Sequence, residues 1–163
     1  MEKNADPQIE KQTKDPEEIR QFLEVLKSMA ERILVPYDKV INIDLDHDGK
    51  TDGYTFQIAN PFYTAESIAS INTLELFIND KKIDPQDISL LVRDQKIRLK
   101  DAKTMHEVWW GFGELISVYV KKYHGLEKGI YNVECNLRMR TTISYGFPGG
   151  LLFPVKKKMK ING

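Results

Sequence analysis

The sequence predicts an all-β protein, an antiparallel β-sandwich preceded by one N-terminal amphipathic helix. Three observations carry this prediction. Apolar residues recur at helical spacing before Pro36, and beyond it the apolar period falls to two. The short apolar runs that follow are separated by turn signals such as Asp48-Gly49 and Asn79-Asp80. Short strands at this spacing are typical of a sandwich rather than an α/β sheet.

The chain has 163 residues, which fits a single domain. We divide it into a disordered tail at 1–14, a helix at 15–36, the sandwich domain at 37–155 and a basic C-terminal tail at 156–163. The first segment is polar and aperiodic. The last contains four lysines between Lys156 and Lys160, a pattern typical of a solvated terminus.

The predicted helix begins at Asp15-Pro16. Asp15 can accept hydrogen bonds from first-turn amides, Pro16 suits the first helical position, and Glu18 completes a capping box. The apolar stripe consists of Ile19, Phe22, Leu23, Leu26, Met29, Ile33 and Leu34. Either the domain's own core or a partner covers this stripe.

The predicted strands are Lys39–Asp44, Tyr54–Ala59, Thr73–Ile78, Ile88–Val92, Ile97–Leu99, Glu114–Lys122 and Tyr131–Arg140. The clearest is Tyr131–Arg140, where apolar and polar residues alternate without exception, as in an antiparallel strand with one wet face. Cys135 lies on the apolar face, so we expect a buried, inert thiol.

Composition excludes several classes of protein. With 24 basic and 24 acidic side chains, the chain lacks the basic excess of a nucleic-acid or membrane-surface binder. A single Cys cannot form an internal disulfide. No apolar run approaches the roughly 20 residues of a membrane span, and the polar N-terminus is unlike a signal peptide. We therefore expect a cytoplasmic protein.

The usual catalytic signatures are missing from the sequence. It has no Gly-x-Ser-x-Gly, His-Glu-x-x-His, phosphate-binding Gly-rich loop or Cys-x-x-Cys. His47, His106 and His124 fall in polar, loop-like surroundings. We therefore predict no catalytic residue in this chain.

One acidic loop has metal-binding character. Asp44, Asp46, Asp48 and Asp52 occupy the first, third, fifth and ninth positions of a calcium-loop pattern, and Gly49 allows a sharp turn. The twelfth position is Thr55 rather than a bidentate Glu. A calcium site of the strand–loop–strand kind and a polar hairpin turn both remain open.

Two aromatic pairs stand in or beside loops. Phe62-Tyr63 follows Asn60-Pro61, and Trp109-Trp110 precedes Gly111. On a strand, neighbouring side chains point to opposite faces, so only one tryptophan can enter the core. The other meets solvent, a ligand or another protein. Exposed Trp and Tyr rings favour interfaces and stack on sugars.

These residues carry a resemblance to a known family. The run from Gly53 to Tyr63 resembles the strand and Pro-aromatic-aromatic loop of the β subunit of bacterial C-glycoside deglycosidases. The similarity continues through Ile71–Ile78, the Val108–Glu114 segment with its Trp-x-Phe-Gly-Glu pattern, and the strand Gly129–Arg140. It spans about Val40 to Pro154. The family's Arg-Gly after the aromatic pair is Thr64-Ala65 here.

The resemblance implies a non-catalytic β-sandwich subunit that supports a TIM-barrel α subunit in a hetero-oligomer. The complex would cleave the C–C bond between a 3-keto-glucosyl group and a flavonoid-type aglycone. The divalent metal, such as Mn, and the acid/base residues would belong to the α subunit. Residues for the partner interface or the aglycone-side lining are Pro61, Phe62, Tyr63, Trp109 and Trp110. The alternative is a free-standing carbohydrate-binding β-sandwich with a structural calcium loop.

Overall fold

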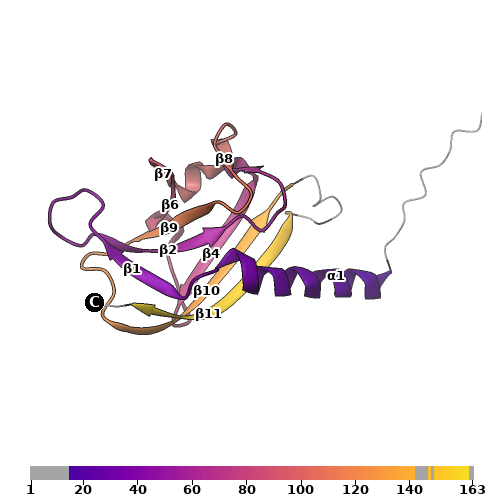
Figure 1. The fold of residues 1–163 in the computed structure, drawn as a ribbon, viewed down its shortest axis with the longest axis horizontal. Helices are drawn as coiled ribbons and strands as arrows, with labels where there is room; N and C mark the ends of the chain where they lie inside the picture. The colour runs from indigo at the N-terminus through magenta and orange to yellow at the C-terminus, as the bar shows by residue number, and fades with distance from the viewer. Residues whose placement is uncertain (1–14, 142–146, 148, 162–163) are drawn as a thin grey trace, which may run out of the picture.

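The computed structural model describes residues 15–141, 147 and 149–161. It confirms an all-β protein with an N-terminal helix (Figure 1). The tail predicted at 1–14 lies outside the described residues. Within the described ranges, no helix has the length and apolar character needed to cross a membrane.

Helix α1 spans Pro16–Met29 and continues as a wider turn, η1, over Ala30–Leu34. Its predicted cap is present, because the Asp15 carboxylate accepts a hydrogen bond from the Glu17 amide at 3.1 Å. Only the C-terminal part of the helical segment packs on the sheet, where Leu26 and Leu34 of the apolar stripe are buried together with Ala30. Phe22 and Leu23 remain 36% and 43% exposed, and α1 extends away from the sheet in Figure 1.

In the part of the chain that the structure describes, eleven strands follow the helix. They are β1 Lys39–Ile43, β2 Gly53–Ala59, β3 Glu66–Ser67, β4 Ile71–Ile78, β5 Lys81–Lys82, β6 Ile88–Val92, β7 Gln95–Arg98, β8 Trp109–Trp110, β9 Leu115–Lys121, β10 Gly129–Met139 and β11 Leu151–Ile161. Among the described residues, three short helices lie between them: η2 Ile68–Ser70, η3 Pro85–Asp87 and η4 Leu99–Thr104. The longer strands agree with the predicted ones to within a few residues, except β11, which was not predicted as a strand. The two-residue strands β3, β5 and β8 have too little periodicity to be predicted.

Nine strands form one sheet in the order β5-β4-β10-β11-β1-β2-β9-β6-β7, and β3 pairs with β8 separately. All neighbours are antiparallel except β1 and β11, which pair in parallel at Lys39↔Lys160 and Val40↔Ile161. This parallel pair joins the two halves of the fold into one curled sheet (Figure 1). Both halves contribute to one hydrophobic core, which includes Phe56 and Phe153.

Strand β10 has the predicted alternation. Val133, Cys135, Leu137 and Met139 are all buried, and the residues between them are more exposed. Burial raises the pKa of the Cys135 thiol to about 12. At neutral pH the thiol is protonated, as expected for a structural cysteine.

The basic segment at 156–163 requires a correction, because its described part is not a tail. Residues up to Ile161 belong to β11 and pair along the whole of β10, ending at Gly129↔Ile161. Val155, Met159 and Ile161 are buried on one face. The Lys157 ammonium lies on that face as well and donates to the Val35 carbonyl at 2.9 Å. In the sequence, the run of lysines obscured the alternation of buried and more exposed residues along this strand.

Candidate functional site

Two loop segments meet at one end of the fold and carry the predicted aromatic residues. The first, 60–64, leaves β2, and the second, 109–114, begins with β8. Asn60 joins them: its buried amide nitrogen donates to the carbonyls of Thr64 and Trp110, each at 2.9 Å. Its amide oxygen accepts from the Phe62 backbone at 2.8 Å. Asn60 therefore closes its own turn and fixes the second segment against it.

The two tryptophans point in opposite directions, as predicted for neighbours on a strand. Strand β8 pairs with β3 at Glu66↔Trp110 and Ser67↔Trp109. Trp110 is fully buried and donates its indole N–H to the Glu114 carbonyl at 2.8 Å. Trp109 is 54% exposed. Of this pair, only Trp109 is in a position to contact a ligand or a partner.

The Pro61-Phe62-Tyr63 segment likewise has a buried part and an exposed part. Pro61 and Phe62 are buried, and the Phe62 ring packs edge-on against Phe153 with ring centroids 5.4 Å apart. Tyr63 is 81% exposed and stacks on Phe112, whose ring centroid lies 6.2 Å away. Phe112 was not among the predicted site residues, although its place in the Trp-x-Phe-Gly-Glu pattern marked it. It is 68% exposed.

Tyr63, Trp109 and Phe112 are called the aromatic surface below. Arg93 restrains the backbone of this surface, in addition to Asn60. The Arg93 guanidinium contacts both carboxylate oxygens of Glu114, at 2.6 and 2.9 Å, and donates to the Trp109 carbonyl at 3.0 Å. An exposed ion pair contributes little stability by itself, at most about 1 kcal/mol. Here it restrains the loop that presents two of the three rings.

Sequence reasoning missed both Asn60 and Arg93. An Asn that precedes Pro at the end of a strand is a turn signal that could have identified Asn60. Arg93 had no such signal, because its contacts with Glu114 and Trp109 join residues that are distant in the sequence. The three histidines His47, His106 and His124 are exposed, and none of them lies in either segment.

The acidic loop between β1 and β2 gathers three of its four predicted ligands. One carboxylate oxygen from each of Asp44, Asp46 and Asp48 lies within 4.8 Å of the others. The Asp44 carboxylate also accepts from the Asp48 and Gly49 amides at 3.2 and 2.7 Å. Gly49 has a φ of +86°, the left-handed geometry expected for this turn. The loop therefore combines a hydrogen-bonded hairpin turn with a concentration of acidic oxygens.

Asp52 has different partners. Its carboxylate accepts from the Leu45 amide at 2.8 Å and from the Tyr119 hydroxyl at 3.0 Å. Desolvation opposes ionisation of Asp52, but these hydrogen bonds outweigh it and lower the pKa of the carboxyl. Desolvation, together with the Asp52 charge, raises the pKa of Tyr119 to about 12.

For the Asp46 carboxyl, the effects that raise the pKa outweigh the effect that lowers it. The hydrogen bond from the Asp48 amide lowers the pKa of the Asp46 carboxyl. Desolvation and the neighbouring acidic groups Asp48, Asp44 and Asp52 raise it by more, so its net shift is upward. The upward shift follows from the crowding of acidic oxygens in this loop, because like charges disfavour each other's ionisation.

Comparisons with known proteins show the family of the chain. A search among curated proteins produced no match. The family model described as C-glycoside deglycosidase beta subunit matches residues 30–145. The match covers both aromatic segments, Asn60 and all of β10, and it extends over more than two thirds of the chain. The chain therefore belongs to the C-glycoside deglycosidase beta subunit family.

Proposed function

We propose that this chain is the non-catalytic β subunit of a metal-dependent C-glycoside deglycosidase. It supports a TIM-barrel α subunit, and the complex cleaves the C–C bond between a 3-keto-glucosyl group and an aromatic, flavonoid-type aglycone. The family of the chain supports a subunit role. The single observation that carries the finer proposal is the aromatic surface, three exposed rings on backbone held by Asn60 and Arg93.

The chemistry of the reaction assigns distinct tasks to the two subunits. A 3-keto group acidifies the neighbouring C–H, so a base removes that proton and the aglycone carbon leaves and takes up a proton. In this proposal the base, the acid and a divalent metal such as Mn belong to the α subunit. The task of Tyr63, Trp109 and Phe112 is contact with the α subunit or with the flat aglycone. Rigid aromatic side chains suit both, because they bury much apolar area at little cost in entropy.

Co-expression with a sugar-isomerase-like α chain tests the proposal. The expected result is a stable complex by native mass spectrometry, and cleavage of a 3-keto C-glucoside that requires both chains and is lost with a metal chelator. Full activity of the α chain alone, with no complex formed, would overturn it. The alternative function, a free-standing carbohydrate-binding module, would then be favoured. Titration of the isolated chain with glycosides would test it.

A structural calcium ion in the acidic loop stays a prediction. We expect millimolar calcium to raise the Tm of the full chain, because a ligand that binds only the folded state stabilises it by about 2.7 kcal/mol at a hundredfold excess over Kd. Asp44→Asn and Asp46→Asn should each abolish most of that shift. Asp94→Asn, in the exposed β6–β7 turn, is the matched control. An equal calcium response in all four proteins, or none in the parent chain, would identify the loop as a hairpin turn only.

A further inference from the structure

The aromatic surface is too small to form a protein interface by itself. An aromatic side chain buries about 150–250 Å² when it is fully covered. Tyr63, Trp109 and Phe112 are already partly covered in the free chain, so together they contribute about 500 Å² at most. A stable interface takes about 800 Å² from each partner. A protein that binds these rings must therefore also cover an adjoining surface.

The surface that adjoins the rings is the outer face of β2, β9 and β6. The turn that carries Phe112 ends at Glu114 and leads directly into β9, whose first residue, Leu115, is exposed. Leu115 pairs with Ala59, the last residue of β2. Arg93, which binds Glu114, directly follows the end of β6. All three strands therefore have one end at the aromatic surface, and their outer face continues from it.

The middle of this outer face is uncharged. On each strand it consists of residues that alternate with core residues such as Phe56 and Val118. The pairing of β1, β2, β9 and β6 brings together the residues called the uncharged face below: Ile41, Thr55, Gln57, Leu91, Leu115 and Ser117. Charged side chains stand at its border, namely Asp38, Lys39, Asp52, Lys96, Arg98 and Lys121. An uncharged centre with a polar border is the composition typical of a protein interface.

The uncharged face is also large enough and suitably shaped to extend an interface. Four residues along β2 correspond to about 13 Å, and the width from β1 to β6 corresponds to about 14 Å. A hollow of about 440 Å³ lies over Thr55, Gln57 and Ser117. Within the described ranges, the polar side-chain groups of these three residues have no hydrogen-bond partner. A partner can therefore fill the hollow and also form hydrogen bonds there.

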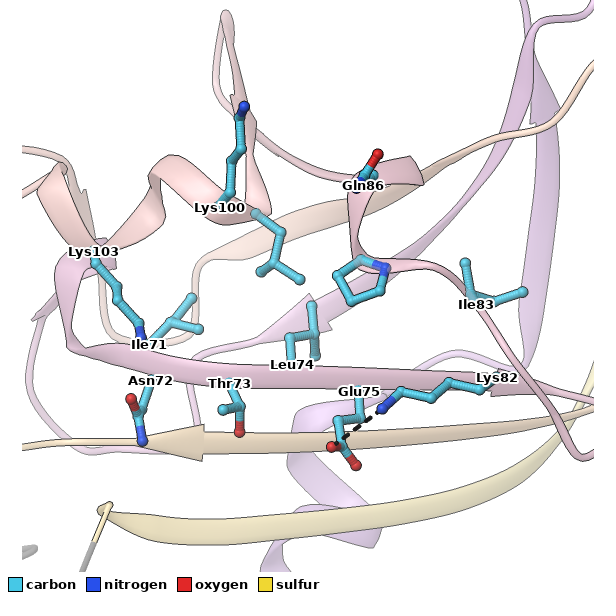
Figure 2. A pocket seen from close by; sticks show the side chains of 12 residues that line it. Ile71, Asn72, Thr73, Leu74, Glu75, Lys82, Ile83, Gln86, Lys100 and Lys103 are labelled. Carbon is cyan, nitrogen blue, oxygen red and sulfur yellow. Dashed lines mark ion pairs between the residues drawn. The ribbon is translucent and has the colours of Figure 1, made fainter.

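The outer face of β4, β10 and β11, in the other half of the sheet, has a different composition. Glu75 and Glu134 lie on it and form ion pairs with Lys82 at 3.6 Å and with Lys156 at 3.7 Å. Figure 2 shows Thr73 and Glu75 together on one side of β4, with the Glu75–Lys82 ion pair as a dashed line. A partner on this face would have to remove water from each of these ions, which is costly. The outer face of β4, β10 and β11 is therefore suited to solvent.

We infer that the uncharged face continues the interface with the α subunit from the aromatic surface across β9, β2 and β1. The inference rests on the proposed function, because that function supplies the partner. One side chain of the α subunit fills the hollow, and polar groups of the α subunit pair with Thr55, Gln57 and Ser117. The partner is the α subunit rather than a second copy of this chain, because the uncharged face adds the area that the rings lack. The outer face of β4, β10 and β11 stays in solvent.

Gln57→Arg tests the centre of the uncharged face. Gln57 is exposed, so the variant should fold like the parent chain. Isothermal titration calorimetry with the α chain purified from the co-expressed complex should show an affinity about tenfold lower or less, because the complex would bury an unpaired charge. Thr73→Arg is the matched control, since Thr73 is an exposed neutral residue on the outer side of β4. It should bind with the affinity of the parent chain.

Hydroxyl-radical footprinting of the parent chain provides a second readout that needs no substitution. Ile41 on the uncharged face and Ile130 on the outer side of β10 are both exposed in the free chain. Formation of the complex should lower the oxidation of Ile41 and Leu115 severalfold and leave that of Ile130 unchanged.

The outcomes distinguish this inference from the proposed function. If a complex forms, parent-like affinity of Gln57→Arg, equal losses in Gln57→Arg and Thr73→Arg, or an Ile41 that stays reactive in the complex would each overturn the inference and leave the proposed function intact. Concentration-dependent protection of Ile41 in the isolated chain would assign the uncharged face to a second copy and would overturn the inference as well. Absence of any complex would overturn both.

Discussion

Trp110→Ala is expected to lower the free energy of unfolding by about 3–5 kcal/mol, the usual cost of truncating a buried large aromatic residue. Trp110 is fully buried, and its indole N–H donates to the Glu114 carbonyl. The substitution therefore leaves a cavity and also removes the donor to that carbonyl. Urea denaturation of the isolated chain, followed by circular dichroism, measures the loss.

Trp110→Phe is the matched control. It retains most of the apolar volume and loses the N–H donor, so we expect a smaller cost, about 1–3 kcal/mol. If Trp110→Ala unfolds within about 1 kcal/mol of the parent chain, the indole ring is not the core element that its burial indicates.

The double variant Tyr63→Ala/Trp109→Ala is expected to weaken association with the proposed α subunit by about 2–4 kcal/mol, a loss of roughly 30-fold to 1,000-fold in affinity. Aromatic residues on restrained backbone dominate many interfaces, and these two are 81% and 54% exposed in the free chain. The folded state should be little affected, because substitutions of exposed residues usually change stability by less than about 0.5 kcal/mol. Isothermal titration calorimetry with purified α subunit measures the association.

Tyr123→Ala is the control for the aromatic surface, because Tyr123 is 70% exposed in a different turn, after β9. It should associate like the parent chain. Normal assembly of the double variant with impaired turnover would assign the rings to the aglycone instead of the α subunit. Normal assembly and normal turnover together would show that the aromatic surface has neither role.

Substitutions of the two tryptophans distinguish an effect on stability from an effect on recognition. In the sequence they are neighbours and equally eligible for an interface. In the structure Trp110 is part of the core, and Trp109 is available to a partner. A loss of activity in Trp110→Ala would therefore be ambiguous, whereas the same loss in a stably folded Trp109→Ala variant would report on the surface.

The sequence by itself determined the features that depend on local periodicity. The alternation in β10 placed Cys135 in the core, and the Asp15-Pro16 signal located the start of α1. The aromatic motifs were enough to identify the family. These features could be predicted because helix and strand periods, caps and turn residues are properties of neighbouring residues.

Only the tertiary structure decided the features that depend on residues distant in the chain. It selected which tryptophan is buried, joined the aromatic segments through Asn60, and placed the lysine-rich segment in β11 beside β10. A strand pattern specifies two faces but not what covers each of them. The burial and pairing of these side chains follow from contacts that form only when the sheet closes on its core.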